Sequence, residues 1–247
     1  MYGWRGRVGI IFPSRGDVLL YEYYKAAPEG VIVVPAALTV KQLTPEQLDR
    51  VLHGYQAAVE DMVYEECDVI VLSGSPPVTM KGYGFEQQMI DRAQAMTKAR
   101  VVAHIRCEVE ALQAVGARRI AIGAPYTPQL TEKFAEYFRA AGFEVAASRC
   151  LGVERNIEIA KLGEDAAYRM ARDLFHAAPD VDAIHLTCPR WPTVLKLRQM
   201  EQDLGVPVTS SSQSVIYATL RRLNVREPIV GYGSLLERLS TDRPFGG

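Results

Sequence analysis

Residues 69–76 read Val-Ile-Val-Leu-Ser-Gly-Ser-Pro, a short apolar run rich in β-branched side chains that gives way to small polar residues and proline. Residues 183–190 follow the same pattern as Ala-Ile-His-Leu-Thr-Cys-Pro-Arg. Short apolar runs bounded by turn-forming residues are typical of strands that are buried on both faces of a parallel sheet. These two stretches therefore predict an α/β fold with two comparable strand ends.

Similar runs recur along the chain and alternate with longer segments of helical period. Strands are predicted at residues 8–12, 31–36, 69–72, 101–105, 119–123, 144–147, 183–187 and 206–209. Helices are predicted at residues 44–66, 85–97, 128–141, 164–177, 192–204 and 214–223. Alternation of this kind indicates parallel strands that are joined by crossover helices.

The order of the elements occurs twice. It reads strand, strand, long helix, strand, helix, strand, helix between residues 8 and 115, and a similar order with shorter insertions lies between residues 119 and 223. Two copies predict two parallel-sheet domains related by a pseudo-two-fold axis, residues 1–116 with 218–247 and residues 117–217. Ligands of parallel α/β units bind at the carboxyl ends of strands. We therefore expect the active site in the cleft between the two halves.

Composition excludes several classes of protein. The 247 residues contain 28 Lys and Arg against 29 Asp and Glu, a formal net charge of −1. A basic excess that could neutralise nucleic-acid phosphates is lacking. The longest apolar runs are far shorter than the roughly 20 residues of a membrane-spanning helix. The N-terminal segment lacks the apolar stretch of a signal peptide, so a cytoplasmic protein without nucleic-acid or membrane partners is expected.

Motifs that hold common cofactors are absent from the sequence. It contains no GxGxxG after the first strand, no Walker A motif, no GxSxG elbow and no HExxH helix. The four cysteines are too few for a disulfide scaffold and lack the CxxC spacing of a zinc site, so free thiols are expected. Acidic residues near the strand ends are limited to Asp17 and Glu108, too few for a metal cage. No cofactor and no metal are predicted.

Cys188 is the candidate for chemistry among the cysteines. It follows the predicted strand 183–187 and precedes a predicted helix, a place where a thiol can serve as nucleophile or proton donor. A cysteine at an arbitrary position is more often a small buried hydrophobe, but the repeat places Cys188 opposite Gly74 at the cleft. Structural roles are expected for the other three, Cys67, Cys107 and Cys150.

Further polar residues follow the predicted strand ends. Tyr126 either donates a hydrogen bond to an oxyanion or is a rim aromatic with its hydroxyl in water. Serines supply donors but are also ordinary turn residues, and these are Ser73, Ser75, Ser210, Ser211 and Ser212. Arginines either clamp a carboxylate or are solvated, and these are Arg15, Arg106 and Arg190. His104 and His185 fall inside predicted strands and are expected to be core histidines.

Six segments carry a resemblance that extends over nearly the whole chain. They are residues 9–13 (Gly-Ile-Ile-Phe-Pro), 43–46 (Leu-Thr-Pro-Glu), 112–121, 204–208, 210–212 (three serines) and 231–233 (Gly-Tyr-Gly). In these segments the chain resembles the aspartate/glutamate racemase superfamily, in the branch that holds arylmalonate decarboxylase and maleate cis-trans isomerase. The resemblance implies two Rossmann-like halves, an active site between them and a reaction that needs no cofactor.

The racemases and maleate isomerases of that superfamily place one cysteine at each of two facing strand ends. This chain keeps Cys188 but has Gly74 at the other position, which resembles arylmalonate decarboxylase. A decarboxylase needs a single proton donor, because loss of CO₂ itself creates the carbanion. The resemblance implies that Cys188 protonates a planar enediolate on one face. It also implies that Ser75 and Tyr126 bind the retained carboxylate, together with backbone N–H groups after Cys188.

Three segments depart from the decarboxylase. Pro76 stands where that enzyme has a hydroxylic residue, residues 189–191 (Pro-Arg-Trp) replace a glycine-rich segment, and residues 13–15 (Pro-Ser-Arg) are more polar than an aryl-binding wall. We therefore expect a substrate that is smaller or more anionic than an arylmalonate, with Arg190 or Arg15 as an extra carboxylate clamp. The substrate-binding residues expected from these segments are Ser14, Pro189 and Arg190.

Three functions are consistent with the sequence. The first is decarboxylation of a substituted malonate with Cys188 as proton donor. The second is isomerisation or racemisation of maleate, aspartate or a similar small acid. The third belongs to another class, a binding or sensing protein on an enzyme-like scaffold. The expected partner is a small carboxylic acid in each case, and the oligomeric state is left open.

Overall fold

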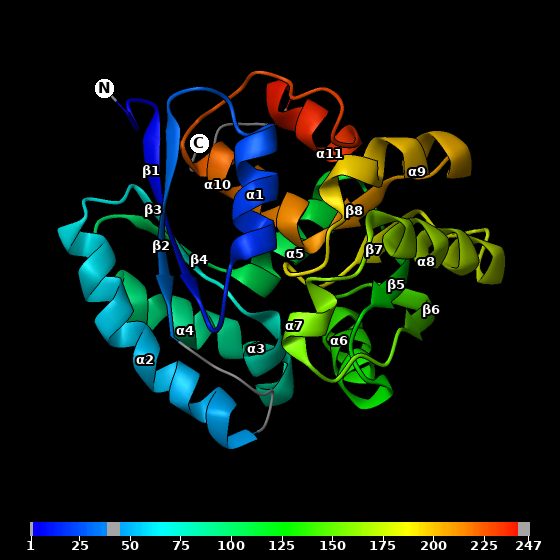
Figure 1. Ribbon diagram of the computed structural model, residues 1–247, viewed down its shortest axis with the longest axis horizontal. Helices are drawn as coiled ribbons and strands as arrows, with labels where there is room; N and C mark the ends of the chain where they lie inside the picture. The colour runs from blue at the N-terminus through cyan, green and yellow to red at the C-terminus, as the bar shows by residue number, and fades with distance from the viewer. Residues whose placement is uncertain (1, 39–44, 242–247) are drawn as a thin grey trace.

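The computed structural model describes residues 2–38 and 45–241, apart from the side chains of residues 45–53. It contains two four-stranded parallel sheets with helices around them (Figure 1). The strand order is β2-β1-β3-β4 in the first sheet and, equivalently, β6-β5-β7-β8 in the second. The strands are β1 (Gly6–Phe12), β2 (Val31–Ala37), β3 (Val69–Leu72), β4 (Arg100–Ala103), β5 (Arg119–Ala124), β6 (Glu144–Cys150), β7 (Ala183–Leu186) and β8 (Val208–Ser210). The predicted α/β class with two parallel-sheet halves is confirmed.

The two sheets also share a register at the edge where the chain leaves them. Leu72, at the end of β3, pairs with Ala103 at the end of β4. Leu186, at the end of β7, pairs in the same way with Ser210 at the end of β8. Residues at equal distances beyond these four ends therefore occupy equivalent positions in the two halves.

A helix that the sequence pattern did not predict, α1 (Asp17–Ala26), connects β1 to β2. Its buried face consists of Leu19, Glu22, Tyr23 and Ala26. Because Glu22 interrupts the periodic apolar pattern of that face, the pattern from which a helix is predicted is weak here. Parallel neighbours such as β1 and β2 require a crossover of this kind. Each half therefore begins with strand, helix, strand, and the predicted start of two consecutive strands was wrong.

The six helices for which the sequence predicts a range have counterparts in the structure, whereas three short helices were not predicted, α3 (Ser75–Lys81), α7 (Asn156–Ile159) and α11 (Ser234–Glu237). Residue 44, the predicted start of the longest helix, lies outside the described residues. The helix at residues 164–177 has the bounds that the sequence predicts. The helices are α2 (Pro45–Tyr64), α3 (Ser75–Lys81), α4 (Phe85–Gln94), α5 (His104–Ala114), α6 (Pro128–Ala140), α7 (Asn156–Ile159), α8 (Glu164–Ala177), α9 (Leu197–Leu204), α10 (Ser211–Arg222) and α11 (Ser234–Glu237), with 3₁₀ turns at Val194–Lys196 and Arg238–Ser240.

Two element boundaries differ from the prediction in ways that matter for the site. The strand β4 ends at Ala103, which has extended backbone angles and precedes the first turn of α5. His104 is therefore the first residue of a helix, and its predicted place in a strand was wrong. The helix α10 begins at Ser211 because the Ser210 side chain accepts a hydrogen bond from the Gln213 N–H at 3.4 Å. Both helices thus begin directly at a strand end.

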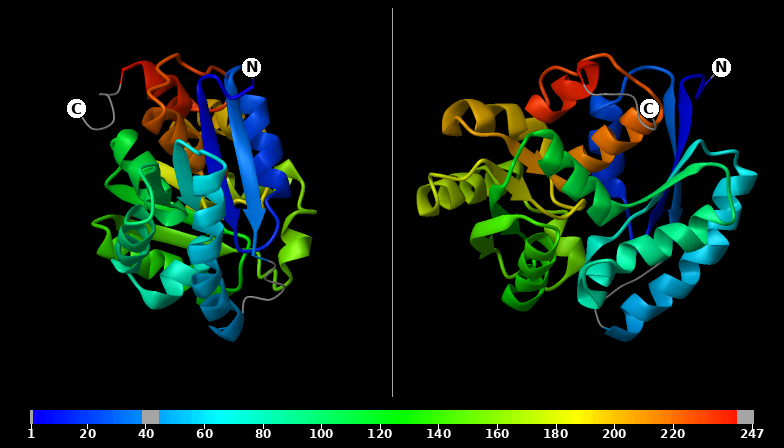
Figure 2. Two further views of the ribbon diagram at one scale, coloured as in Figure 1. Left: turned by 90° about the vertical axis from the view of Figure 1, so that its left-hand side faces the viewer. Right: turned by 180° about the vertical axis from the view of Figure 1, so that it is seen from behind.

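Helices α1, α5 and α10 lie between the two sheets and join the halves (Figures 1 and 2). Tyr23 Oη of α1 is 2.8 Å from Thr219 Oγ1 of α10. Arg222 of α10 donates to both carboxylate oxygens of Glu110 on α5, at 2.7 and 2.8 Å. One buried apolar cluster runs through both halves, and a second packs beneath α2 and α4. The domain boundary predicted at residue 218 falls within α10, and the predicted boundaries stay a prediction.

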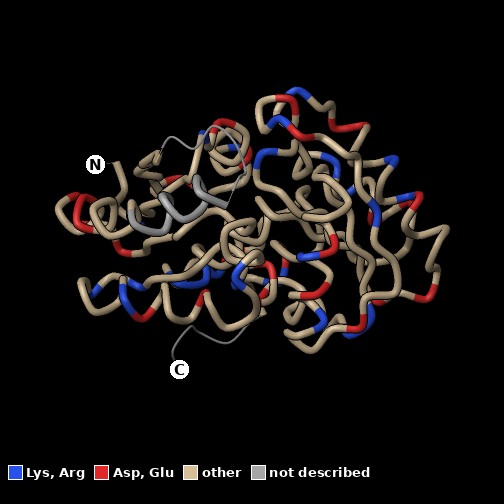
Figure 3. The backbone as a smooth tube through the Cα atoms, turned by 90° about the horizontal axis from the view of Figure 1, so that it is seen from below, with Lys and Arg blue, Asp and Glu red and all other residues tan. Residues whose placement is uncertain are grey.

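The surface charge is mixed. Basic and acidic residues both occur along the backbone of each half (Figure 3), in agreement with the net charge of −1. In the part of the chain that the structure describes, no helix is long and apolar enough to span a membrane.

Candidate active site

A small pocket lies at the ends of β3 and β7, with one wall from each half. The first half contributes residues 12–15 and Ser73, Gly74, Pro76 and Pro77. The second half contributes Tyr126, Asn156 and residues 188–190. Six residues predicted for the site thus line one pocket: Ser14, Gly74, Tyr126, Cys188, Pro189 and Arg190.

Gly74 and Cys188 occupy equivalent places, two residues beyond β3 and β7, and they share an unusual backbone conformation. Gly74 has φ +112° and Cys188 has φ +102°. Glycine adopts positive φ without strain, whereas a side chain in this region costs on the order of 1–3 kcal/mol and is found mainly at functional sites. The strained residue in this pocket is therefore the cysteine.

The Cys188 sulfur is buried among hydrogen-bond donors. The Tyr126 hydroxyl and the backbone N–H groups of Arg190 and Trp191 hydrogen-bond to it. Burial raises the pKa of Cys188 to about 11, and the nearby Glu108 charge adds to the rise, while the three donors oppose it. The thiol is therefore protonated at neutral pH, although donors that would stabilise a thiolate surround it.

Tyr126 resolves one of the alternatives that the sequence left open. Its side chain is buried and stacks on Phe134, with ring centroids 5.4 Å apart. Burial raises the pKa of Tyr126 well above 10, and its contact with Cys188 adds to the rise. The hydroxyl is therefore a retained O–H donor inside the pocket and is not at a wet rim.

The wall opposite Cys188 has no space for a second side chain at Gly74. A Cβ atom there would lie 2.7 Å from Pro13 Cγ and 3.3 Å from the Tyr55 hydroxyl. That hydroxyl also donates to the Ser73 carbonyl and holds the turn in place. Among the described residues that line the pocket, Cys188 is the single cysteine.

Polar groups at the mouth of the pocket connect the two halves. Asn156 Nδ2 donates to Ser14 Oγ at 2.8 Å. Arg190 pairs with Asp17 through its Nε and Nη2 atoms, at 3.1 and 3.4 Å. Arg15 is exposed at the pocket and makes no ion pair within the described part of the chain. Arg15 is thus an exposed cation near the mouth, whereas the charge of Arg190 is already paired with Asp17.

The other predicted residues lie elsewhere. Ser75 is buried, and its hydroxyl donates to Glu108 Oε1 at 2.7 Å, so it is not among the residues that line the pocket. Arg106 belongs to α5 and is also outside the lining. Cys67, Cys107 and Cys150 are free thiols away from the pocket. In the described residues, no group of three or more His, Cys, Asp or Glu side chains is arranged to hold a metal ion.

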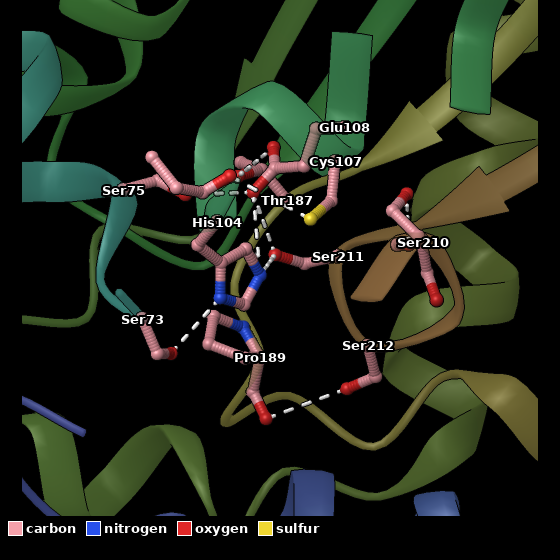
Figure 4. Close-up of polar contacts among 12 residues, drawn as sticks. Ser73, Ser75, His104, Cys107, Glu108, Thr187, Pro189, Ser210, Ser211 and Ser212 are labelled. Atoms are coloured by element: carbon pink, nitrogen blue, oxygen red, sulfur yellow. Dashed lines mark hydrogen bonds and ion pairs between the residues drawn. The ribbon is translucent and has the colours of Figure 1, made fainter. Parts of the chain in front are cut away.

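A network of buried polar side chains contacts the pocket wall at Ser73 (Figure 4). His104 and His185 are fully buried, as predicted, but both belong to this network. Glu108 Oε1 accepts from Ser75 and from Ser211, the latter at 2.8 Å. Glu108 Oε2 lies 2.9 Å from His185 Nε2 and accepts from Thr187 at 3.3 Å. The carboxylate therefore joins residues from both halves.

The charge state of the network follows from these contacts. Burial opposes ionisation of Glu108, but the hydrogen bond and charge of His185, with further help from His104 and Ser75, hold its pKa below the ordinary value. Burial lowers the pKa of His104, against the pull of the Glu108 charge. At neutral pH the network thus contains a carboxylate and a neutral His104.

Comparison with known proteins places the chain in a family. The sequence profile of the family described as arylmalonate decarboxylase matches residues 8–236. The chain belongs to this family. A maleate isomerase of Geobacillus stearothermophilus is 25% identical over 244 residues, which cover 93% of this chain and 96% of that protein. The arylmalonate decarboxylase of Bordetella bronchiseptica is 23% identical over 214 residues, which cover 87% of this chain and 89% of that protein.

Solved structures of a maleate isomerase and of an arylmalonate decarboxylase share the fold. The Nocardia farcinica maleate cis-trans isomerase, a cysteine-to-serine mutant with a covalently bound succinylcysteine intermediate, has a TM-score of 0.87 at 23% identity, covering 94% of this chain and 98% of that one. A liganded arylmalonate decarboxylase with glycine-to-cysteine and cysteine-to-serine changes also reaches 0.87, at 22% identity, covering 93% and 98%. The resemblance to this branch is confirmed, and the family is one of enzymes.

Several site residues were missed by sequence reasoning. Asn156 lies in a segment without a clear pattern, and nothing in the sequence signals its place at the pocket. His104 and Glu108 did carry a signal, because residues four apart share one face of a helix. That signal becomes visible only when His104 is recognised as the start of α5 and not as part of a strand.

Proposed function

We propose that this protein is a cofactor-independent enzyme that transfers a proton from Cys188 to the α-carbon of a small carboxylic acid. The observation that carries the proposal is the state of the Cys188 thiol, which is protonated, buried and set opposite a glycine that leaves no room for a second thiol. A single donor of this kind suits a reaction that generates its own carbanion.

Decarboxylation of a substituted malonate is the reaction that this geometry supports. The bond between the α-carbon and one carboxylate breaks, CO₂ leaves, and the electron pair passes into the retained carboxylate as an enediolate. The S–H of Cys188 then protonates the α-carbon and leaves a thiolate. The Tyr126 hydroxyl and the N–H groups of Arg190 and Trp191 stabilise that thiolate until water returns the proton.

The pocket walls limit the substrate. Phe12, Pro13, Pro76 and Pro77 supply apolar surface on the first half, while Arg15 supplies positive charge near the mouth. Arginine binds carboxylates through two parallel hydrogen bonds, and Arg190 already holds Asp17 in this way. A small diacid fits this mixture of surfaces better than a large aryl substituent.

Isomerisation of a small diacid is the second candidate, and the comparisons favour it. Two maleate isomerases are 25% and 27% identical to this chain, against 23% for the arylmalonate decarboxylase. The intermediate in the Nocardia farcinica enzyme is a covalent cysteine adduct in a mutant that has lost another cysteine. An adduct in this chain would form on Cys188, whose pKa of about 11 disfavours the thiolate at neutral pH.

A turnover screen in deuterated water distinguishes these reactions. Substituted malonates, maleate and amino acids are incubated with the protein, and mass spectrometry follows CO₂ loss, isomerisation and deuterium at the α-carbon. Cys188-dependent CO₂ loss supports decarboxylation, whereas isomer formation without CO₂ loss supports the second candidate. Tight diacid binding without any turnover would reject both in favour of a binding protein. Undiminished turnover by Cys188→Ala would reject the role of the thiol.

A further inference from the structure

A continuous chain of hydrogen bonds leads from the pocket wall into the protein interior. Ser73 lines the pocket, and its Oγ is 2.9 Å from Nδ1 of His104. His104 Nε2 is 2.9 Å from Ser211 Oγ, which donates to Glu108 Oε1 at 2.8 Å. All four side chains are buried (Figure 4). The chain of contacts therefore connects a pocket hydroxyl to a buried carboxylate.

The direction of each hydrogen bond follows from the carboxylate. Ser211 gives its proton to Glu108, so its oxygen can only accept from His104 Nε2–H. A neutral His104 with a proton on Nε2 has a lone pair on Nδ1. Ser73 must therefore donate its proton to Nδ1, which leaves only lone pairs on its oxygen for a ligand in the pocket. Ser73 thus faces the pocket as an acceptor.

This arrangement is that of a hydroxyl activated by a neighbouring base. His104 can take the Ser73 proton, and the resulting imidazolium would lie 3.6 Å from Glu108 Oε1. The carboxylate is itself held by donors from four residues, Ser75, Thr187, His185 and Ser211. A buried charge with this many partners is fixed in place and can stabilise a transient positive charge.

Ser73 and Cys188 lie on opposite walls of the same pocket, since one follows β3 and the other follows β7. We propose that Ser73, backed by His104 and Glu108, is the second proton-transfer group of the pocket and acts on the face of the α-carbon that Cys188 does not reach. The inference rests on the proposed function because it uses the same pocket and the same enediolate. Ser73 is the catalytic residue here, and His104 and Glu108 act through it.

The step balances in protons and charge. The α-hydrogen passes as a proton to Ser73 Oγ while the hydroxyl proton of Ser73 passes to His104 Nδ1. The C–H electron pair moves into the substrate carboxylate as an enediolate, and the imidazolium is compensated by Glu108. Cys188 then delivers its own proton to the opposite face. A small carboxylic acid with an α-hydrogen would thereby be inverted by a hydroxyl–thiol pair, without a second cysteine.

Deuterium exchange with separated enantiomers tests the two walls independently. The probes are the enantiomers of aspartate, 2-methylsuccinate and 2-phenylpropionate in deuterated water, and NMR and mass spectrometry follow the α-deuterium. Removing a general base typically costs 10²–10⁴-fold, so Ser73→Ala and His104→Gln should slow exchange of one enantiomer about 100-fold or more. Cys188→Ser should slow exchange of the other. Ser214→Ala, at a buried serine outside the network that donates to the Ser210 carbonyl, is the matched control and should change neither.

The outcomes separate failure of this inference from failure of the proposed function. Exchange that depends on Cys188 but is equal in wild type and Ser73→Ala would overturn the inference alone. The inference alone would also be overturned if the protein decarboxylated a substrate in a Cys188-dependent way but exchanged the α-hydrogen of none of the probes. If Cys188→Ser kept both decarboxylation and deuterium exchange at the wild-type rate, the proposed function itself would be overturned.

Imidazole NMR tests the relay without any substrate. The chain has four histidines, so His104→Gln assigns the His104 resonances in protein labelled with ¹⁵N-histidine. A neutral ring protonated on Nε2 at pH 7, with an Nδ1 shift that changes in Ser73→Ala, supports the inference. A ring protonated on Nδ1, or a cationic ring at pH 7, would overturn it whatever the turnover screen finds.

Discussion

The ends of β3 and β7 have the same backbone shape but carry different chemistry. Two residues beyond each strand the chain turns through positive φ, at Gly74 in the first half and at Cys188 in the second. The pseudo-two-fold relation between the halves therefore places the same backbone turn at both strand ends. It does not dictate the side chain, because glycine adopts this conformation freely and cysteine does so only with strain. A strained residue that stability alone would not favour is best explained by its chemistry.

The residues behind the two ends differ as well. His104 and Ser211 are equivalent, since each is the first residue after the fourth strand of its sheet, and they contact each other at 2.9 Å. In the first half this position holds the imidazole of His104, which hydrogen-bonds to Ser73. In the second half it holds the hydroxyl of Ser211, which donates to Glu108. The comparison indicates a thiol that acts alone on one wall and a hydroxyl that depends on a relay on the other.

Replacing the thiol of Cys188 should change the activity more than any other substitution at the two strand ends. Cys188→Ser is expected to lower kcat at least 10³-fold in whichever reaction the turnover screen identifies, because a serine hydroxyl is a far weaker acid than a thiol. Circular dichroism and the urea midpoint should change little. Cys150→Ser, at a half-buried thiol outside the pocket, is the control and should retain full activity. A wild-type rate for Cys188→Ser would contradict the asymmetry between the two ends.

The protonation state of Cys188 gives the next largest effect. With a pKa of about 11, the thiol should react with iodoacetamide at pH 8 about 100-fold more slowly than a thiol with a pKa of 9, since each pKa unit changes the thiolate fraction about tenfold. The rate should keep rising up to about pH 11. Turnover that needs the protonated thiol should show the opposite sign and fall as the pH approaches 11. Peptide mass spectrometry and a pH–rate profile measure the two, and an alkylation rate that levels off below pH 9 would contradict a raised pKa.

A side chain at the opposite end should have a smaller effect. Gly74→Ala adds a Cβ that meets Pro13 and requires strained positive φ, so we expect a loss of about 2–4 kcal/mol in the free energy of unfolding, combining strain and steric overlap. Activity should fall roughly 10–100-fold as the turn shifts. Gly142→Ala, at φ +97° with no neighbour near its Cβ position, separates strain from overlap. Equal losses in the two variants would show that Pro13 does not restrict this wall.

The shared features of the two ends could be predicted from the sequence because they depend on local patterns. Apolar runs located β3 and β7 to within one residue, and the repeat aligned Gly74 with Cys188. Where buried positions carry polar residues, the patterns fail. Glu22 breaks the apolar face of α1 because its carboxylate accepts the N–H groups of Thr193 and Val194, at 2.7 and 2.8 Å. Burial raises the pKa of Glu22 to about 7, a state that only the folded structure creates.

The difference between the two ends was harder to predict because it depends on distant segments. The relay combines Ser73 from the turn after β3, His104 and Glu108 from α5, and Ser211 from α10. Each of these residues has an ordinary explanation as a turn serine or a core histidine. Their roles follow from the direction of the hydrogen bonds between them, and the spacing of these residues along the chain does not specify that direction.

The smallest expected effect tests the strain at Cys188 itself. In Cys188→Ala the Cβ keeps the cost of positive φ, about 1–2 kcal/mol for an L-residue, whereas Cys188→Gly releases it and loses roughly 0.5–1 kcal/mol through greater freedom of the unfolded chain. The glycine variant should therefore be more stable than the alanine variant by about 0.5–1 kcal/mol in urea unfolding, although both are inactive. The sign is opposite to that of Gly74→Ala, where a Cβ is added. An alanine variant as stable as the glycine variant would mean that the turn after β7 accommodates a side chain without strain, and selection for chemistry would then not be needed to explain Cys188.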